Sequence, residues 1–359
     1  MNFKQKLANV IWLSVQTDRY FYANSIIIFF RNRLYPSGIK YFISTPACIL
    51  FWFMLLFHNA EAQDTGSGLD FLNIGPSAQI LSMGEGTTAY PTGSSSIYSN
   101  PSLLSFEKQS GLDINYTLWI SNLNTQFAAV HFKSNQLTYG FGIYGTRADD
   151  FEARSQPGPS SGSFSVSYLS LSTAVAYQVG PFSTGVTAQY LREEIFQLRA
   201  NGYAFNVGTS LRLFKEKVLA GVSLNNLGEM EKLETTATPL PTMLNAGVSL
   251  KLIEFMTPGN NDFPLLIGIL TDWSMPLDEH YRGDFTSEEV QDSYTTIGLT
   301  VDAADLFDFQ TAYRMGPTER PLSFGMGLSI QPVQFNYSFI PFSTGYGTAH
   351  SFGLQYSFN

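Results

Sequence analysis

Few residues in this sequence have the types and spacing that catalysis or metal binding requires. The four histidines are His58, His131, His280 and His350. No two of them are separated as in the zinc motifs H-x-x-x-H or H-E-x-x-H, and the sequence lacks G-x-S-x-G, P-loop and dinucleotide-binding patterns. His131 has no nucleophile signature among its neighbours, so we interpret it as a structural histidine. The residues therefore predict a protein that is not an enzyme and binds no cofactor and no metal.

The densest group of oxygen ligands lies at residues 278–292, which read DEHYRGDFTSEEVQD. Such carboxylates could hold a divalent cation, but their spacing does not match an EF-hand loop. A solvated acidic loop is the simpler interpretation. The acidic pairs at positions 149–150 and 193–194 are likewise interpreted as loop or strand-end charges.

The composition is poor in charge and rich in aromatic residues and glycine. Of 359 residues, 14% are charged and 15% are aromatic, with 30 Gly, 30 Phe and 19 Tyr. An ordinary soluble domain has about 25% charged residues. This mixture favours pleated strands over long helices. The formal net charge of -9 gives no electrostatic reason to expect a nucleic-acid partner.

Residues 1–62 are expected to be an N-terminal extension and a signal peptide. An apolar block at residues 49–57 follows the basic residues Arg31, Arg33 and Lys40 and precedes Ala60-Glu61-Ala62. This order is typical of a secretory signal cleaved after Ala62. The alternative is an uncleaved anchor, although the block is shorter than the roughly 20 residues of a membrane-spanning helix. The single cysteine, at position 48, lies in this segment, so no disulfide or thiolate site is expected after it.

The rest of the chain alternates apolar and polar residues with the period of a β-strand. The C-terminus is the clearest case, because Phe352, Leu354, Tyr356 and Phe358 alternate with Ser, Gly and Gln. Fourteen such segments are predicted, beginning near residues 111, 124, 136, 165, 182, 199, 217, 241, 264, 293, 305, 321, 332 and 347. Most run about 10 residues or more, long enough for a tilted strand to cross a bilayer. A soluble β-sandwich would show the same period. Strand length and the lengths of the connections must therefore distinguish a transmembrane barrel from a sandwich.

The predicted connections nearly alternate between short and long, as in outer-membrane barrels. Short links occur near residues 134, 180, 215, 303 and 331, with departures near residues 121 and 254–263. Residues 111–359 are therefore predicted to form an all-β, antiparallel transmembrane barrel in the outer membrane, with both barrel ends periplasmic. Phe352, Leu354, Tyr356 and Phe358 would form a C-terminal signal for the barrel-assembly machinery, with Asn359 as the one discordant residue. Arg147 and Arg154 could contact lipopolysaccharide phosphates.

Residues 71–105 read FLNIGPSAQILSMGEGTTAYPTGSSSIYSNPSLLS and resemble the start of the PorV/PorQ family of outer-membrane proteins. That family typically reads F-L-x-I-G-x-S-A-R-A-x-x-M-G-G-A, followed by N-P-A-x-L. This chain departs from the pattern at Gln79, Glu85 and Ser102. The C-terminal residues 337–342 and 350–354 also resemble the family. PorV/PorQ proteins are in turn similar to FadL-like channels, whose fold is a fourteen-stranded barrel plugged by an N-terminal hatch.

The resemblance implies that residues 63–110 form this hatch. The segment is rich in Gly, Ser and Pro, yet too apolar to be a solvated tail. The hatch motif residues, with a structural or gating role, would be Gly75, Met83, Gly84, Asn100 and Pro101. For Asn100-Pro101 a simple turn is an equally good interpretation, since Asn can bond its own backbone and Pro fixes φ.

Two functions follow from the resemblance, and a structural barrel without a substrate is a third possibility. The first is a role in protein secretion and surface attachment through a type IX-like pathway, with secretion components or exported cargo as partners. The alternative is a FadL-like channel for the uptake of apolar small molecules. Predicted lumen positions are mainly Ser, Thr, Gly, Asn and Gln, which argues mildly against a continuous apolar conduit.

Overall fold

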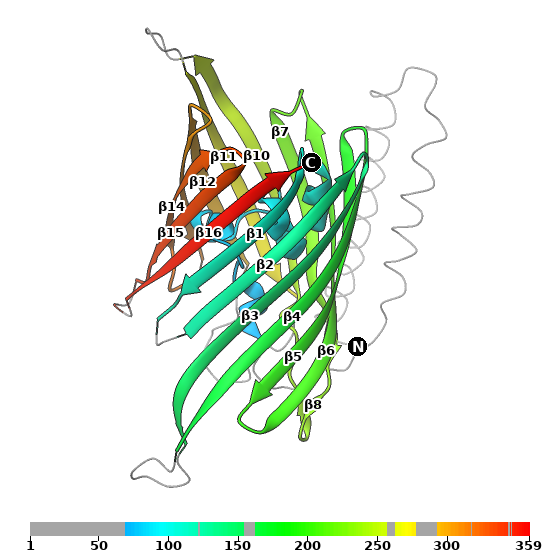
Figure 1. Ribbon diagram of the computed structural model, residues 1–359, viewed down its shortest axis with the longest axis vertical. Coiled ribbons are helices and arrows are strands. Elements are labelled where there is room, and N and C mark those ends of the chain that lie inside the picture. The colour runs from blue at the N-terminus through cyan, green and yellow to red at the C-terminus, as the bar shows by residue number, and fades with distance from the viewer. Residues whose placement is uncertain are drawn as a thin grey trace, which may run out of the picture. The chain divides into compact units, whose positions relative to one another are not determined.

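The computed structural model describes residues 69–120, 123–153, 162–256, 263–277, 293–316, 318–343, 345 and 347–359. Fourteen strands pair in antiparallel register and close into a barrel. They are β1 (Ser110–Leu118), β2 (Leu123–Ser134), β3 (Leu137–Ala153), β4 (Gly162–Val179), β5 (Phe182–Ile195), β6 (Leu198–Leu213), β7 (Val218–Met230), β10 (Met243–Met256), β11 (Pro264–Pro276), β12 (Tyr294–Ala303), β13 (Phe307–Met315), β14 (Leu322–Ile330), β15 (Val333–Pro341) and β16 (Thr348–Phe358). Strand β1 pairs with β16 from Ser110 opposite Phe358 onward, which closes the ring (Figure 1).

The predicted fourteen-stranded barrel is confirmed, and every predicted strand start lies within a few residues of an observed one. One pair of strands was not predicted. A short hairpin of β8 (Lys232–Leu233) and β9 (Thr236–Ala237) lies in the long link between β7 and β10. Among the described residues, no helix has both the length and the apolar character needed to cross a membrane.

The alternation of side chains sorts the barrel into an apolar outside and a polar inside. Phe141, Phe309 and Phe352 each expose about half of their surface, at 53%, 51% and 51%. Ser170 and Ser338, from the opposite face of their strands, are fully buried. A closed ladder satisfies the strand backbone internally, and an apolar outer band matches lipid, so both features suit a transmembrane barrel.

The two rims of the barrel differ. We call the rim that carries Ser110 and Phe358 the terminal rim, and the opposite one the loop rim. Turns at the terminal rim are mostly tight and use left-handed backbone, as at Asn135 (φ 53°) and Gly180 (φ 58°). The link from β10 to β11, Met256 to Pro264, is the longer exception expected from the sequence.

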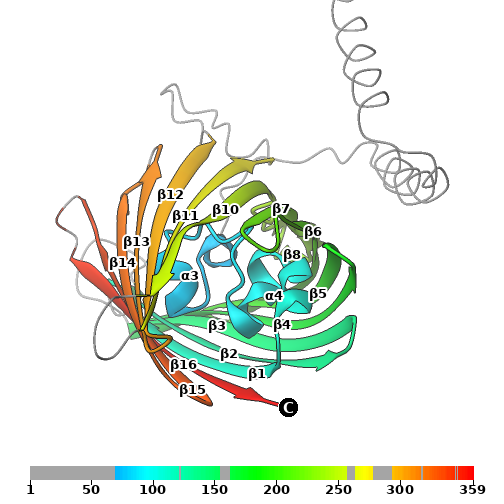
Figure 2. The same cartoon turned by 90° about the horizontal axis from the view of Figure 1, so that it is seen from above.

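A chain segment before β1 fills the barrel lumen. It contains η1 (Asp70–Asn73), α3 (Ala78–Ser82), η2 (Gly93–Ser95), α4 (Ser96–Ser99) and η3 (Pro101–Phe106). Figure 2 shows α3 and α4 enclosed by the ring of strands. Its apolar side chains are almost entirely buried, including Leu69, Ile80, Leu81, Met83, Ile97, Leu103 and Leu104. We call residues 69–109 the plug. The expected signal segment 1–62, its cleavage site and residues 63–68 lie outside the described residues, so the domain boundaries there stay predictions.

Candidate functional site

The backbone of the plug packs against inward-facing glycines of the barrel strands. A Cβ built on Gly185 would lie 2.5 Å from the carbonyl carbon of Pro101, and one on Gly221 would lie 2.3 Å from the carbonyl oxygen of Thr88. Real Cβ atoms do not approach backbone so closely, so these positions require glycine. Gly208 meets Asn100 in the same way. The inward-facing glycines of β5, β6 and β7 thus let the plug backbone lie directly on the wall.

Asn100 and Pro101 form a helix cap that is tied to the wall. Asn100 is fully buried, and its Oδ1 accepts hydrogen bonds from the Ser102 backbone N–H and Oγ at 3.2 and 2.7 Å. Its Nδ2 donates to the Thr88 carbonyl at 2.7 Å and to Ser210 Oγ on β6 at 3.1 Å. Pro101 takes the first position of η3, where its missing N–H costs nothing. The motif is therefore a cap and a wall anchor in this state. Its gating role stays a prediction.

The other predicted motif residues surround a buried ion cluster. The backbone N–H of Gly75 donates to Glu85 Oε1 at 3.1 Å. Gly84 has a left-handed backbone (φ 57°), and its carbonyl accepts from Arg314 at 2.7 Å. Met83 is fully buried and packs against Gly298 of β12. These contacts give the three residues structural roles, and the structure adds no evidence for gating.

Glu85 itself, a departure from the family pattern, is the centre of this cluster. It forms an ion pair with Arg314 of β13 and a second one with Arg320 at 3.3 Å. Burial alone would raise the pKa of Glu85, but the fields of Arg320 and Arg314 and its hydrogen bonds outweigh burial and hold the pKa at about 2. The plug is therefore fastened to the wall by a carboxylate that stays ionised at neutral pH.

Two wall carboxylates fasten other parts of the plug. Asp272 of β11 accepts from the Thr88 N–H at 2.8 Å and from Thr88 Oγ1 at 2.9 Å. Asp113 of β1 accepts from the Ser95 N–H at 3.0 Å. Both are almost fully buried. These residues and Arg314 were not predicted from the sequence, although each stands at a lumen-facing position of a strand, where strand parity would have placed it.

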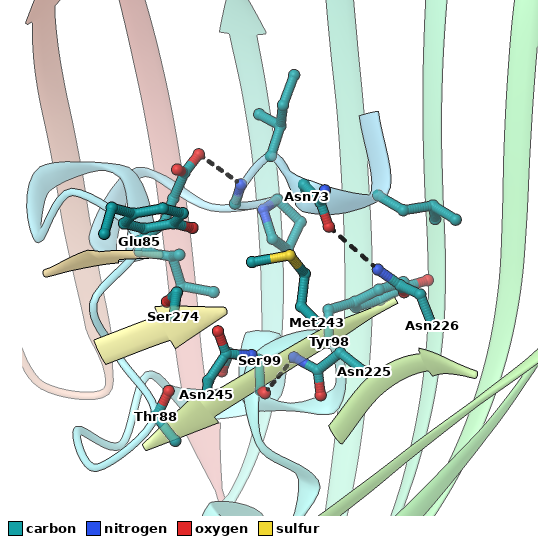
Figure 3. Close-up of a pocket in the computed structure, with 16 residues that line it drawn as sticks. Asn73, Glu85, Thr88, Tyr98, Ser99, Asn225, Asn226, Met243, Asn245 and Ser274 are labelled. Carbon is teal, nitrogen blue, oxygen red and sulfur yellow. Dashed lines mark hydrogen bonds between the residues drawn. The ribbon is translucent and has the colours of Figure 1, made fainter. Parts of the chain in front are cut away.

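A pocket lies between the plug and the wall on the loop-rim side (Figure 3). Asn225 donates to the Ser99 carbonyl at 2.9 Å, and Asn226 donates to Asn73 Oδ1 at 3.4 Å. The remaining lining is both polar and apolar, and includes Leu72, Ile74, Ile80, Glu85, Thr88, Tyr98, Met243, Asn245, Ser274 and Tyr294. The cavity volume is about 60 Å³. A cavity that binds benzene measures about 150 Å³, so an aromatic ring does not fit while the plug stands as it does.

Two larger cavities lie on the terminal-rim side of the plug. One, of about 260 Å³, lies between Tyr90-Pro91 and strands β6, β7, β10, β11 and β12. The other, of about 600 Å³, shares Tyr90, Leu266 and Asp302 with it. Thr88 lines the loop-rim pocket and Tyr90 lines both terminal-rim cavities, so residues 88–91 separate the two sides. We call residues 88–91 the partition.

Within the part of the chain that the structure describes, the histidines and acidic residues singled out in the sequence do not come together in a reactive site. His131 is buried, with Nδ1 2.8 Å from Ser94 Oγ and Nε2 2.8 Å from the Gln109 carbonyl oxygen. This Ser-His pair lines none of the cavities described above, in keeping with the predicted structural role. Arg147 pairs with Asp149 at 2.8 Å, and Glu194 pairs with Arg199 at 3.0 Å. Arg154, His280 and the acidic segment 278–292 lie outside the described residues.

No family model matches the sequence, and no curated protein matches it. Three solved structures with similar folds are described as transporters or channels. The toluene transporter TbuX of Ralstonia pickettii has a TM-score of 0.52 and 11% identity, over 80% of this chain and 98% of its own. The toluene transporter TodX of Pseudomonas putida has a TM-score of 0.51 and 11% identity, over 83% and 99%. The monoaromatic hydrocarbon channel CymD has a TM-score of 0.50 and 13% identity, over 82% and 98%.

These similarities concern the fold alone, a closed fourteen-stranded antiparallel barrel. They agree with the fold that the predicted resemblance to FadL-like channels implied. None of these matches carries the PorV/PorQ name.

Proposed function

We propose that this protein is a non-enzymatic outer-membrane channel through which small apolar molecules pass, with its strand termini on the periplasmic side. The observation that carries the proposal is the divided lumen, with one pocket on the loop-rim side and larger cavities on the terminal-rim side of the partition. The fold shared with toluene transporters and a monoaromatic hydrocarbon channel supports the same conclusion. This reverses the order expected from the sequence, in which secretion came first.

The substrates best suited to this proposal are monoaromatic hydrocarbons such as toluene. The loop-rim pocket, of about 60 Å³, is too small for a ring. Passage therefore requires the plug to shift at the partition, which is held by hydrogen bonds and close packing rather than by covalent links. Outer-membrane lipid and lipopolysaccharide would surround the apolar outer band.

A second candidate is a PorV/PorQ-type role in protein secretion or surface attachment. The observation that favours it is the match of residues 71–105 to the start of that family, including Asn100-Pro101. In that role the loop rim would hold a secretion component or an exported protein, and the plug would stay closed.

Deleting the gene in the native organism separates the two candidates. Uptake of radiolabelled toluene and the set of surface and secreted proteins, identified by mass spectrometry, are measured in the same strains. Slower uptake with an unchanged protein set, restored by complementation, supports the channel. Loss of specific surface proteins with unchanged uptake contradicts the channel and supports the secretion role.

A further inference from the structure

The terminal-rim cavity of about 260 Å³ differs in chemistry from the loop-rim pocket. The apolar part of its lining consists of Tyr90 and Pro91 from the plug and leucines such as Leu219, Leu266 and Leu270 from the barrel. The cavity exceeds the roughly 150 Å³ that accommodates benzene in a protein interior. A single aromatic ring or a short aliphatic chain therefore fits, whereas a long chain would exceed the volume.

Cationic side chains border one side of this cavity. They are Arg212, Lys217 and Lys251, on β6, at the start of β7 and on β10. Arg212 is already engaged, because it pairs with Glu216 at 3.0 Å and donates to the Phe106 carbonyl at 2.8 Å. Within the described residues, no ion pair or hydrogen bond joins the ammonium group of Lys217 or Lys251 to another side chain. Two cations are thus left to interact with a ligand.

Two carboxylates also line the cavity: Glu216, which is already paired with Arg212, and Asp302 on β12, two strands along the ring from Lys251. Asp302 lines the same cavity, lies within electrostatic range of Lys251, and stands directly across the β12–β13 ladder from Asp308. A bound anion would be repelled by Asp302 and attracted by the ammonium groups of Lys217 and Lys251. The charge distribution therefore sets an orientation, with the acidic group of a ligand toward Lys217 and Lys251 and its apolar body toward Leu266 and Leu270.

We propose that this cavity is a binding site for a small monocarboxylate with an apolar body about the size of one ring, held between the partition and the β6–β12 wall. The site is distinct from the loop-rim pocket, which contains no lysine or arginine. It does not depend on the channel proposal, since a site facing the periplasm can fill from that side without any transport.

The test is binding of benzoate to the purified full-length protein in nanodiscs, measured by isothermal titration calorimetry, with benzamide as the uncharged ligand of the same shape. Partly exposed ion pairs contribute about 0.2–1 kcal/mol, so we expect each lysine to favour benzoate by a factor of roughly 1.4 to 5. Raising the salt concentration should reduce the preference. The variants are Lys217→Gln, Lys251→Gln and the double variant. Lys232→Gln, on the loop-rim hairpin, is the matched control.

The proposal expects benzoate to bind more tightly than benzamide in the wild type and in Lys232→Gln, with the two ligands binding equally in the double variant. Equal binding in the wild type, a preference that survives in the double variant, or no benzoate binding overturns the proposal. A wild-type protein that binds benzoate but takes up no toluene would refute the channel and leave this site standing.

Discussion

Replacing Gly185 with alanine should loosen the plug where Asn100 and Pro101 lie on the wall. The added Cβ would lie 2.5 Å from the Pro101 carbonyl carbon and 2.6 Å from the Ser102 nitrogen. Either the plug or the wall must retreat by about 1 Å to restore normal contact. The wall strand is hydrogen-bonded on both sides to β4 and β6, so the plug is the part that yields.

The size of the effect follows from the usual cost of overpacking, about 1–3 kcal/mol. That cost corresponds to roughly 5- to 150-fold more frequent opening of the local structure. The assay is amide hydrogen exchange of residues 100–106, followed by mass spectrometry on the protein in nanodiscs. We expect faster exchange in this segment of Gly185→Ala, with the barrel strands unchanged.

The matched control is Gly145→Ala on β3, whose added Cβ would meet its nearest neighbours at 3.5 and 3.7 Å, an ordinary contact distance. Exchange in this control should equal that of the wild type. If residues 100–106 of Gly185→Ala also exchange at the wild-type rate, the wall glycines do not position the plug.

Three further predictions concern the ion cluster, the lipid-facing surface and the C-terminus. The pKa of Glu85 is lowered from 4.5 to about 2. The stabilisation of the folded plug by ionised Glu85 is therefore complete above pH 4.5 and is lost as the pH falls toward 2. The ratio of pepsin cleavage of the plug in Glu85→Gln to cleavage in the wild type, taken at each pH so that the changing activity of pepsin cancels, should therefore fall toward one over that range. A ratio that does not change with pH would contradict the role of the cluster. Phe141→Arg places a charge on a side chain that is 53% exposed on the outer face, and should lower the free energy of unfolding in lipid vesicles by about 2–4 kcal/mol if the site lies near the bilayer centre. An unchanged urea midpoint would mean that Phe141 does not face lipid. Phe358→Ala should lower the yield of heat-modifiable, folded barrel in the outer membrane, and a normal yield would remove Phe358 from the predicted assembly signal.

The strand positions were predictable because one physical rule governs them. Successive side chains on a transmembrane strand face lipid and the lumen in turn. Apolar and polar residues therefore alternate along each strand, as at Phe352, Leu354 and Tyr356. The β8–β9 hairpin escaped prediction because its strands are two residues each and leave no periodic signal.

The plug was expected from a family resemblance together with apolar residues that needed a packing partner. Its attachments could not be predicted, because they join residues far apart in the sequence. Thr88 and Asp272 are 184 positions apart, and Glu85 and Arg314 are 229 apart. Strand parity could have marked Asp272 and Arg314 as lumen-facing charges, but a single sequence does not say which plug residue each one meets. The partition and the terminal-rim cavity depend on the same long-range contacts.

The most direct test of the central claim, that passage requires the plug to move at the partition, is a reversible lock. A Cβ built on Gly86 would lie 2.9 Å from the Thr296 Cβ on β12, slightly closer than the roughly 3.5–4.5 Å found in disulfides. Gly86→Cys with Thr296→Cys, in a Cys48→Ser background, should therefore join plug and wall beside the partition with a small shift.

The measurement is uptake of radiolabelled toluene by cells of a host without a hydrocarbon channel, carrying the double-cysteine protein in the outer membrane, before and after reduction. Each single-cysteine protein is the control for the effect of the reductant. We expect uptake close to the empty-vector level in the oxidised state and faster uptake after reduction. The contradicting result is equal uptake in the two states, at a level well above that of the empty vector and with the disulfide verified. It would show that toluene passes without movement of the plug at this position.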